Sequence, residues 1–352
     1  MKQRCYCLTA HHQPLERREA EVPQPKAGEV LVKILAAGVC HSDIHIWEGE
    51  YDLGSGRKLV LRDRGVALPL VMGHEIAGEV AALGPDAQGL QVGDKVLVYP
   101  WLGCGECRTC ARGQENLCLR PASLGVYQAG GYAEYVLAPR AAYCIDLGGL
   151  DPAEAAPLAC SGVTTYSALR KFGSVIEEEP VVIMGAGGLG HMALAVLRAM
   201  GGKGAIMVDI DEAKRARAVE AGALSAIDGS APDAAGQIIA ATGGGARLVL
   251  DLVGSASTVN LAIAGATRGT EIVVVGLYGG ELAVPIPFFP LRPLAIRGSY
   301  VGNLGELREL VGLALDGRLA LVKVSRRPLD DASEVLAQLK AGQVFGRAVL
   351  VP

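Results

Sequence analysis

The pattern of hydrophobic and polar residues changes near residue 162, and this change divides the chain into two parts. In residues 1–161, short apolar stretches such as residues 30–34 and 92–98 alternate with turns rich in glycine and proline. From residue 162 onward, apolar stretches of strand length alternate with helical patterns. Short strands joined by turns are typical of a small β-barrel-like domain, whereas strand–helix alternation indicates a parallel, doubly wound sheet. The sequence therefore predicts an α/β protein with two domains.

The second pattern is regular enough to predict individual elements. Strands are expected at residues 181–184, 205–209, 248–252, 272–276 and 348–351, and helices at residues 191–200, 212–221, 256–267, 304–317 and 330–341. Periodicity leaves open whether the last of these elements pack against the first domain. Residues 48–70 are charged and rich in glycine and arginine, and we expect an irregular loop there. The expected domains are residues 1–161 with 300–352, and residues 162–299.

Composition narrows the class of protein. A chain of 352 residues fits two domains, and with 50% hydrophobic and 20% charged residues it has enough apolar side chains for a large core. The net charge is −4 and no long basic run occurs, which argues against nucleic acid or an anionic membrane as a partner. The first residues lead into no apolar run, so we expect no secretory leader, and no apolar run approaches the ~20 residues that a membrane span needs. We expect a cytoplasmic protein.

Four of the nine cysteines stand close together. Cys104, Cys107 and Cys110 are followed after seven residues by Cys118. This spacing, in a charged loop, suits a closed tetrahedral zinc site whose role is to order the loop. The alternatives are disulfide bonds, which a reducing compartment disfavours, and a redox Cys-x-x-Cys pair, which has no use for the other two cysteines.

Three further residues offer the ligand set of a catalytic zinc ion. Cys40 and Cys160 supply two thiolates and His74 supplies an imidazole. Three protein ligands leave one position open for water or an alcohol, whose proton is then lost more readily. The alternative is that these are three unrelated core or loop residues.

Several polar residues flank those ligands in the sequence. Glu75 follows His74 and is expected to approach the metal as an exchanging ligand. Asp43 is expected to hold a ligating histidine by its second ring nitrogen. Ser42 and His45 are expected to form a proton relay from a bound alcohol to water.

A glycine-rich loop follows the strand expected at residues 181–184. It reads Gly185, Ala186, Gly187, Gly188, Leu189 and Gly190, and it opens a helix. In this context the pattern predicts dinucleotide binding, with the pyrophosphate at the helix N-terminus. Asp209 ends the next strand, where its carboxylate would bond the adenosine ribose and repel a 2′-phosphate, so NAD is favoured over NADP. Lys214 is expected to add a second contact. The alternatives are a turn without a ligand and a solvated strand end.

On these motifs the chain resembles the zinc-containing medium-chain alcohol dehydrogenases, and the resemblance covers nearly the whole chain. The matching segments are residues 38–43, 73–75, 104–118, 156–160 and 185–190. The resemblance implies a GroES-like β-barrel catalytic domain, a Rossmann coenzyme domain, and a return of the C-terminal segment to the first domain. It also implies two zinc ions per chain, one catalytic and one structural, and NAD.

The resemblance assigns further residues. It places His41 near the coenzyme phosphates, Arg347 at the pyrophosphate, and Thr164, Val253, Gly254, Gly276 and Val301 at the nicotinamide half. It implies reversible oxidation of a primary or secondary alcohol to an aldehyde or ketone, in a homo-oligomer with a tetramer preferred over a dimer. The interval from Cys40 to His74 is long, and residues 50–69 carry the extra length, so the substrate range cannot be transferred directly.

Other interpretations stay open at this point. Trp47, Trp101, Leu124 and Tyr278 either line an apolar substrate pocket or belong to the core. A polyol, amino-alcohol or hydroxyacyl-CoA dehydrogenase of the same superfamily is the nearest rival function. More distant rivals are a non-catalytic NAD sensor and a zinc-containing nucleic-acid-binding protein, which the acidic balance disfavours.

Overall fold

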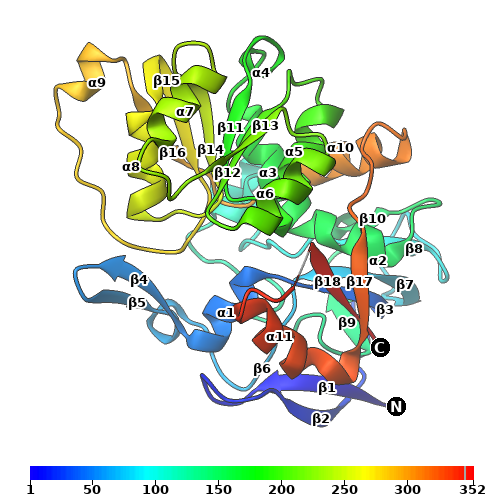
Figure 1. Ribbon diagram of the computed structural model, residues 1–352. Helices are drawn as coiled ribbons and strands as arrows, with labels where there is room; N and C mark the ends of the chain where they lie inside the picture. Colours follow the sequence, from blue (N-terminus) through cyan, green and yellow to red (C-terminus); the bar gives the residue numbers. More distant parts are fainter. Residues whose placement is uncertain (345) are drawn as a thin grey trace. The chain divides into compact units, whose positions relative to one another are not determined.

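A computed structural model describes residues 1–344 and 346–352, which form two compact units (Figure 1). The first unit comprises residues 1–50, 60–163 and 302–352, and the second comprises residues 51–59 and 164–301. The C-terminal segment therefore belongs with the N-terminal one. The part of the chain that the structure describes has no helix that is long and apolar enough to cross a membrane.

The main sheet of the first unit has seven strands. They are β3 (Val30–Val39), β7 (Glu75–Leu83), β8 (Lys95–Val98), β9 (Tyr135–Ala138), β10 (Cys144–Asp146), β17 (Val324–Pro328) and β18 (Arg347–Val351). The order is β10-β8-β7-β3-β18-β17, and β9 also pairs with β3. Strand β3 is central, and its side chains are almost all buried, as expected of a strand that is covered on both faces.

Strand register brings distant segments to one edge of this sheet. β3 and β7 are antiparallel with Gly38 opposite Glu75, and β18 and β3 are antiparallel with Ala348 opposite Val39. The residue after β3, the residue before β7 and the first residue of β18 therefore lie close together.

The remaining elements of the first unit surround this sheet. A smaller antiparallel sheet has the order β2-β1-β6, from β1 (Lys2–Leu8), β2 (Glu16–Glu21) and β6 (Leu70–Val71). The α-helices are α1 (His41–Glu48), α2 (Pro152–Ala155), α10 (Leu304–Leu315) and α11 (Ala332–Lys340), and α3 (Ser161–Arg170) begins here and continues into the second unit. Short 3₁₀ helices are η1 (Leu61–Arg64), η2 (Cys110–Arg112), η3 (Glu115–Leu117), η4 (Ala141–Tyr143), η5 (Ala156–Ala159) and η6 (Leu329–Asp331).

The second unit is built on a six-stranded parallel sheet. Its strands are β11 (Val181–Met184), β12 (Ala205–Asp209), β13 (Ser225–Asp228), β14 (Ala246–Asp251), β15 (Ala266–Val274) and β16 (Ala295–Gly298). The order is β13-β12-β11-β14-β15-β16, with parallel pairing throughout. The chain runs outward in opposite directions from β11 and β14, and such a switch point is where doubly wound sheets bind ligands at the carboxyl ends of their strands.

Helices complete the second unit. They are α4 (Val175–Glu178), α5 (Gly188–Ala199), α6 (Glu212–Glu220), α7 (Ala234–Ala241), α8 (Ala256–Ala264) and α9 (Phe288–Leu291). A buried apolar cluster joins the sheet to helices α7 and α8 through residues such as Val182, Val249, Ile238 and Ile263. Burial of this kind is the main stabilising contribution to a domain of this size.

The expectation of an irregular loop at residues 48–70 was wrong. The structure forms a hairpin of β4 (Glu50–Gly54) and β5 (Arg57–Val60), followed by η1. Residues 51–59 group with the second unit because the side chains of Ser55 and Arg57 both bond the carboxylate of Glu281. Gly54 and Gly56 have positive φ angles and enclose the turn, which is a hairpin signal that the charged composition obscured.

Candidate active site and structural metal centre

Three metal-ligating side chains meet at the edge of the main sheet. The ligand atoms of Cys40, His74 and Cys160 all lie within 4.8 Å of one another, and the three residues are buried. Cys40 follows β3 and His74 precedes β7, so the register of these strands brings them together. Cys160 directly follows η5, which packs on the same strands. The structure therefore assembles the triad that the sequence predicted.

The geometry of this triad fits a zinc ion. With Zn–S bonds of about 2.3 Å and tetrahedral angles, two thiolates on one zinc ion stand about 3.8 Å apart, and the Sγ atoms of Cys40 and Cys160 are 3.9 Å apart. Nε2 of the buried His74 lacks a hydrogen-bond partner in the described part of the chain, which is costly unless a metal satisfies it. A hydrogen bond from Cys160 holds the pKa of the Cys40 thiol well below its usual value, as a thiolate ligand requires.

A buried polar network holds two of these ligands. Asp43 Oδ1 lies 3.3 Å from Nδ1 of His74. Its other oxygen accepts hydrogen bonds from the backbone N–H of Cys40 and the hydroxyl of Tyr132, both at 2.9 Å. Asp43 therefore orients one ligand and the helix cap that carries another. Sequence reasoning found Asp43 but missed Tyr132, because no local motif marks a tyrosine 89 residues away.

Glu75 is next to the triad and forms a buried ion pair. Its Oε1 accepts hydrogen bonds from the guanidinium of Arg347 and, at 3.4 Å, from the backbone N–H of Ser161. Burial raises the pKa of Glu75 to about 7, and the positive charge of Arg347 opposes this. Residue 38 has to be glycine, because a Cβ there would overlap the Glu75 carboxylate. The pyrophosphate contact expected of Arg347 stays a prediction, since its partner here is Glu75.

Helix α1 carries the residues expected to move a proton. Ser42 Oγ lies 3.9 Å from Sγ of Cys40. One turn further on, Nδ1 of His45 is 3.9 Å from the carboxylate of Glu48. Burial lowers the pKa of His45, and the charge of Glu48 opposes that change. His41, the first residue of α1, is exposed.

The four residues proposed as pocket walls have different surroundings. The ring of Trp101 lies 5.1 Å from the ring of His74 and donates its indole N–H to a carbonyl of η5, so it stands at the metal triad. Leu124 is fully buried. Trp47 is half-buried and contacts a histidine ring and a lysine ammonium group. Tyr278 belongs to the second unit and is 76% exposed. Their substrate contacts stay predictions.

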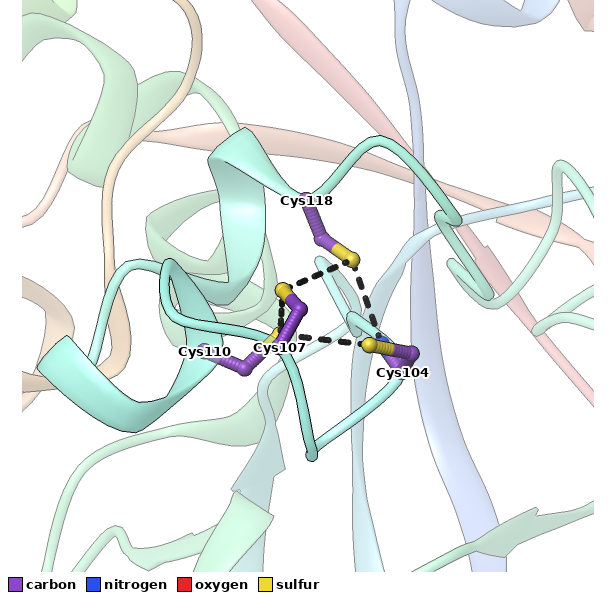
Figure 2. Close-up of side chains that lie close together, drawn as sticks. All are labelled: Cys104, Cys107, Cys110 and Cys118. Carbon is purple, nitrogen blue, oxygen red and sulfur yellow. Dashed lines mark hydrogen bonds between the residues drawn. The ribbon is translucent and has the colours of Figure 1, made fainter.

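The second cysteine cluster forms a separate group of four sulfurs (Figure 2). Sγ of Cys107 lies 3.6 Å from that of Cys110 and 3.8 Å from that of Cys118, and Sγ of Cys104 lies 4.0 Å from that of Cys110. These separations match the edges of a tetrahedron of sulfurs around zinc. A side chain at Gly103 would overlap Sγ of Cys110, so glycine lets the loop close over the group.

The loop backbone supplies the charge compensation for this group. The backbone N–H of Glu106 is the main cause that lowers the pKa of Cys104 to about 6, and the N–H of Cys110 likewise lowers the pKa of Cys107. Arg120 donates hydrogen bonds to Sγ of Cys104 at 3.4 Å and to Glu106 at 2.6 Å. Four sulfur ligands leave no open position, so this group fits a structural zinc site.

The glycine loop of the second unit has the geometry of a phosphate cradle. Gly185 follows β11 with φ of +98°, and Gly187 caps the N-terminus of α5. A Cβ on Gly190 would overlap the carbonyl oxygen of Gly185, so glycine permits the close contact between strand and helix. Asp209 ends β12, and its carboxylate accepts the N–H of Ala186 at 2.8 Å. The acidic residue and the loop therefore lie side by side, as dinucleotide binding requires.

Residues expected at the nicotinamide half lie after the carboxyl ends of β14 and β15 and at the first and last residues of the range 164–301, which are Thr164 in α3 and Val301. Gly254 has φ of +70° and packs against the carbonyl of Gly276, where a Cβ would overlap it. Thr164 has a buried hydroxyl with no hydrogen-bond partner among the described residues. Val301 is buried with φ of +41°, a strained conformation for a β-branched residue. An unpaired hydroxyl and stored strain are both typical of a ligand site, so these positions fit a bound coenzyme.

A buried carboxylate that the sequence analysis missed shapes the same region. Asp251 accepts hydrogen bonds from the backbone N–H groups of Val253 and Gly254, both at 2.9 Å, and from Thr258 at 2.8 Å. Like Asp209 it ends a parallel strand, and this position was the signal that could have found it.

The comparison with family profiles identifies both parts of the chain. Residues 26–148 match the alcohol dehydrogenase GroES-like domain, and residues 188–316 match the zinc-binding dehydrogenase domain. The expected fold, a GroES-like domain with a Rossmann domain, is confirmed by these matches and by the parallel sheet of the second unit.

Relatives over nearly the whole chain agree. A protein named NAD-dependent alcohol dehydrogenase from Sulfurisphaera tokodaii is 40% identical over 341 residues, which cover 96% of this chain and 97% of that protein. The D-arabinose 1-dehydrogenase (NADP(+)) of Saccharolobus solfataricus is 33% identical over 361 residues, covering 100% and 98%. The solved alcohol dehydrogenase of Aeropyrum pernix superposes with a TM-score of 0.89 at 33% identity, covering 99% of this chain and 100% of that one. The chain therefore belongs to the zinc-containing medium-chain alcohol dehydrogenases, with Zn²⁺ and NAD as its cofactors.

Proposed function

We propose that the chain catalyses the reversible oxidation of a primary or secondary alcohol to an aldehyde or ketone with NAD⁺. The observation that carries this proposal is the buried triad of Cys40, His74 and Cys160, a group in which the described residues supply three zinc ligands and no fourth. A site with three protein ligands keeps a position for substrate, in contrast to the closed four-cysteine group. Relatives named NAD-dependent alcohol dehydrogenase, 38% to 40% identical, support both the coenzyme and the substrate class.

The residues around the triad have distinct roles in this proposal. Bound zinc supplies Lewis-acid polarisation of the substrate oxygen, and NAD⁺ supplies the hydride acceptor. Asp43 fixes the orientation of His74 through Nδ1. The Ser42 hydroxyl takes the proton of the alcohol and passes its own proton on. The neutral imidazole of His45 accepts that proton. Burial lowers the pKa of His45 and so favours the neutral form that can act as acceptor.

A panel of alcohols with NAD⁺, together with zinc content per chain, tests this function. We expect turnover of aliphatic, aromatic or cyclic alcohols and two zinc ions per chain. Protein that holds zinc and binds NADH but oxidises no alcohol would contradict the proposal and favour the NAD sensor. Binding of nucleic acid without any enhancement of NADH fluorescence would favour the nucleic-acid module.

The coenzyme preference rests on Asp209, whose carboxylate lies at the glycine loop. A carboxylate there bonds the ribose hydroxyls of NAD and repels the 2′-phosphate of NADP. We expect Asp209→Gly to lower the ratio of kcat/KM for NAD⁺ to that for NADP⁺ by about 10-fold, which corresponds to about 1.4 kcal/mol. An unchanged ratio would exclude this role.

A polyhydroxylated substrate is the second candidate. The similarity to the D-arabinose 1-dehydrogenase, 33% identical over all of this chain, favours it. The apolar ring of Trp101 beside His74 favours the simple alcohol instead. Comparing kcat/KM for D-arabinose, sorbitol and threonine with the values for simple alcohols decides between the two, because the preferred class should differ by 10-fold or more.

We also propose that the protein is a homo-oligomer, with a tetramer preferred over a dimer, in the cytoplasm. Among the described residues, the edge strand β16 pairs only with β15, so its outer edge is open. Exposed apolar side chains gather in the segment around it, namely Leu277, Tyr278, Ile286, Leu291 and Tyr300. A second copy covering this surface would remove an aggregation hazard. The nine free cysteines suit a reducing compartment. A monomer by light scattering at assay concentration would contradict the assembly.

A further inference from the structure

A carboxylate and an ammonium group continue from His45 toward solvent. Nδ1 of His45 lies 3.9 Å from Oε2 of Glu48, and Oε1 of Glu48 lies 2.9 Å from Nζ of Lys340. The exposed fractions of these side chains rise from 18% to 26% to 46% along this series. The three groups therefore form a series of increasing exposure that starts at His45, the residue expected to receive the proton, and ends at the solvent-exposed Lys340.

This arrangement is fixed by contacts on both sides of helix α1. Lys340 is the last residue of α11, and its ammonium group also lies 4.4 Å from the ring centroid of Trp47. The indole N–H of Trp47 donates to the carbonyl of Gln13 at 2.7 Å, and the ring of His12 meets the indole edge to face at 5.1 Å. Glu48 is therefore held at a defined position between the imidazole and the ammonium group.

We propose that Glu48, held by Lys340, is a positioning residue that orients the His45 imidazole and relays its proton to solvent. The proposal rests on the proposed proton path through Ser42 and His45. For each alcohol oxidised, one hydride leaves to NAD⁺ and one proton enters the path. The imidazole gains that proton at one ring nitrogen and gives up the proton on Nδ1 to the Glu48 carboxylate, which passes it to water. Because Nδ1 and the carboxylate are 3.9 Å apart, this transfer runs through a bridging water or after the side chains close to hydrogen-bond distance. This proton transfer involves no oxidation or reduction, and the carboxylate is regenerated.

The charges around His45 determine in which direction each substitution should change its proton affinity. Glu48 and His41, on the same helix, and Cys40, at its N-cap, act electrostatically on His45. From the elements packed against this helix come Lys340, at the end of α11, and His11 and His12, in the loop before β2, which lie against Gly49 and Trp47. The carboxylate of Glu48 stabilises the imidazolium, and Lys340 offsets part of that effect. Removing Glu48 and removing Lys340 should therefore change the proton affinity of His45 in opposite directions.

The test compares Glu48→Gln with Lys340→Met in the zinc-loaded, NAD⁺-bound enzyme. Hydride transfer to NAD⁺ needs neutral His45, so its rate in a single turnover rises with pH through the pKa of this residue. We expect Glu48→Gln to move this limb to lower pH and Lys340→Met to move it to higher pH, each by about 0.5 to 1 pH unit for half-exposed charges. Glu48→Asp should restore part of the profile. Asp86→Asn, which removes an exposed carboxylate from the turn after β7, serves as the matched control and should leave the profile unchanged.

A readout that does not depend on turnover completes the test. In NMR spectra of histidine-labelled protein, His45→Gln identifies the His45 signals among the six histidines, and the two charge variants should shift the pKa of those signals in the same opposite directions. If the rate profile keeps its limb in His45→Gln, the relay itself is wrong and this inference is lost with it. If His45→Gln removes the limb but Glu48→Gln and Lys340→Met leave both the rate profile and the NMR titration in place, only the role of Glu48 is refuted.

Discussion

The two cysteine sites of the first unit use the same sulfur spacing for different purposes. The Sγ–Sγ distance is 3.9 Å in the catalytic triad and 3.6 to 4.0 Å in the structural group. The structural group takes its four ligands from one loop, and backbone N–H groups of that loop stabilise its thiolates. The triad takes three ligands from three distant segments, and a buried carboxylate orients them. Local ligands suffice to order a loop, whereas an open catalytic position needs support from the whole sheet.

The largest expected effect comes from breaking the triad. Cys40→Ser or His74→Ala should lower kcat/KM for an alcohol by about 1,000-fold or more, because several kcal/mol of transition-state stabilisation depend on the metal. Zinc content should fall from two to one per chain, and NADH binding measured by fluorescence should stay within about 3-fold. Near-normal activity in either variant would show that the triad is not the catalytic metal site, and the contrast with the structural four-cysteine group would be lost.

The support of the triad can be weakened without removing a ligand. Asp43→Asn keeps the size of the side chain but loses the charge that faces His74, so activity or zinc affinity should fall by about 10- to 100-fold. Tyr132→Phe removes one hydrogen bond to the same carboxylate and should have a smaller effect. The measurement is kcat/KM at a series of free zinc concentrations. Equal effects of the two variants would show that the charge on Asp43 contributes no more to activity or zinc affinity than the single hydrogen bond from Tyr132.

Breaking the structural group should affect stability more than chemistry. Cys107→Ser removes one of four sulfur ligands, and a loss of about 3 kcal/mol would lower Tm by roughly 6 to 12 °C for a unit of about 200 residues, the size of the first unit. The rate constant of the enzyme that stays folded should change less than about 3-fold. A large loss of kcat at unchanged Tm would reverse the roles given to the two sites.

The smallest effect is expected from the partly exposed partner of the structural group. Arg120→Met removes the hydrogen bonds to Cys104 and Glu106, but the Arg120 side chain is 65% exposed and solvent screens its charge. Tm should fall by about 1 to 3 °C with activity unchanged. Arg112→Met, which removes an exposed arginine from the same loop, is the matched control. A change as large as that of Cys107→Ser would show that the loop backbone alone does not hold the thiolates.

The same contrast explains how much the sequence could predict. Strands at residues 181–184 and 205–209 were predicted with their observed bounds, because each is an apolar run beside a helix, and the second run ends at the charged Asp209. The edge strands β13 and β16 were missed, since each has only four residues and carries a charged side chain. The helix at Ala234–Ala241 was also missed, because its alanine-rich run shows little periodicity.

Site residues divide in the same way. Ligands were found from short motifs, and Asp43 from its neighbours in sequence. Tyr132, the pairing of Glu75 with Arg347, and the contact of Glu48 with Lys340 were not found, because each depends on strand register or helix packing between segments far apart in the chain. Sequence patterns report local geometry, and these contacts are set by tertiary structure.

Strand β18 has a consequence for how the protein is made. It supplies Arg347, the counter-charge of Glu75, and it pairs with β3 immediately before Cys40. A nascent chain that has left the ribosome only as far as Cys160 already contains every ligand of the triad, but Glu75 still lacks its cation. The surroundings of the triad can therefore reach their final form only after residues 347–351 have been synthesised and have paired with β3, so a metal ion loaded onto the nascent chain before then would bind before Glu75 has its counter-charge.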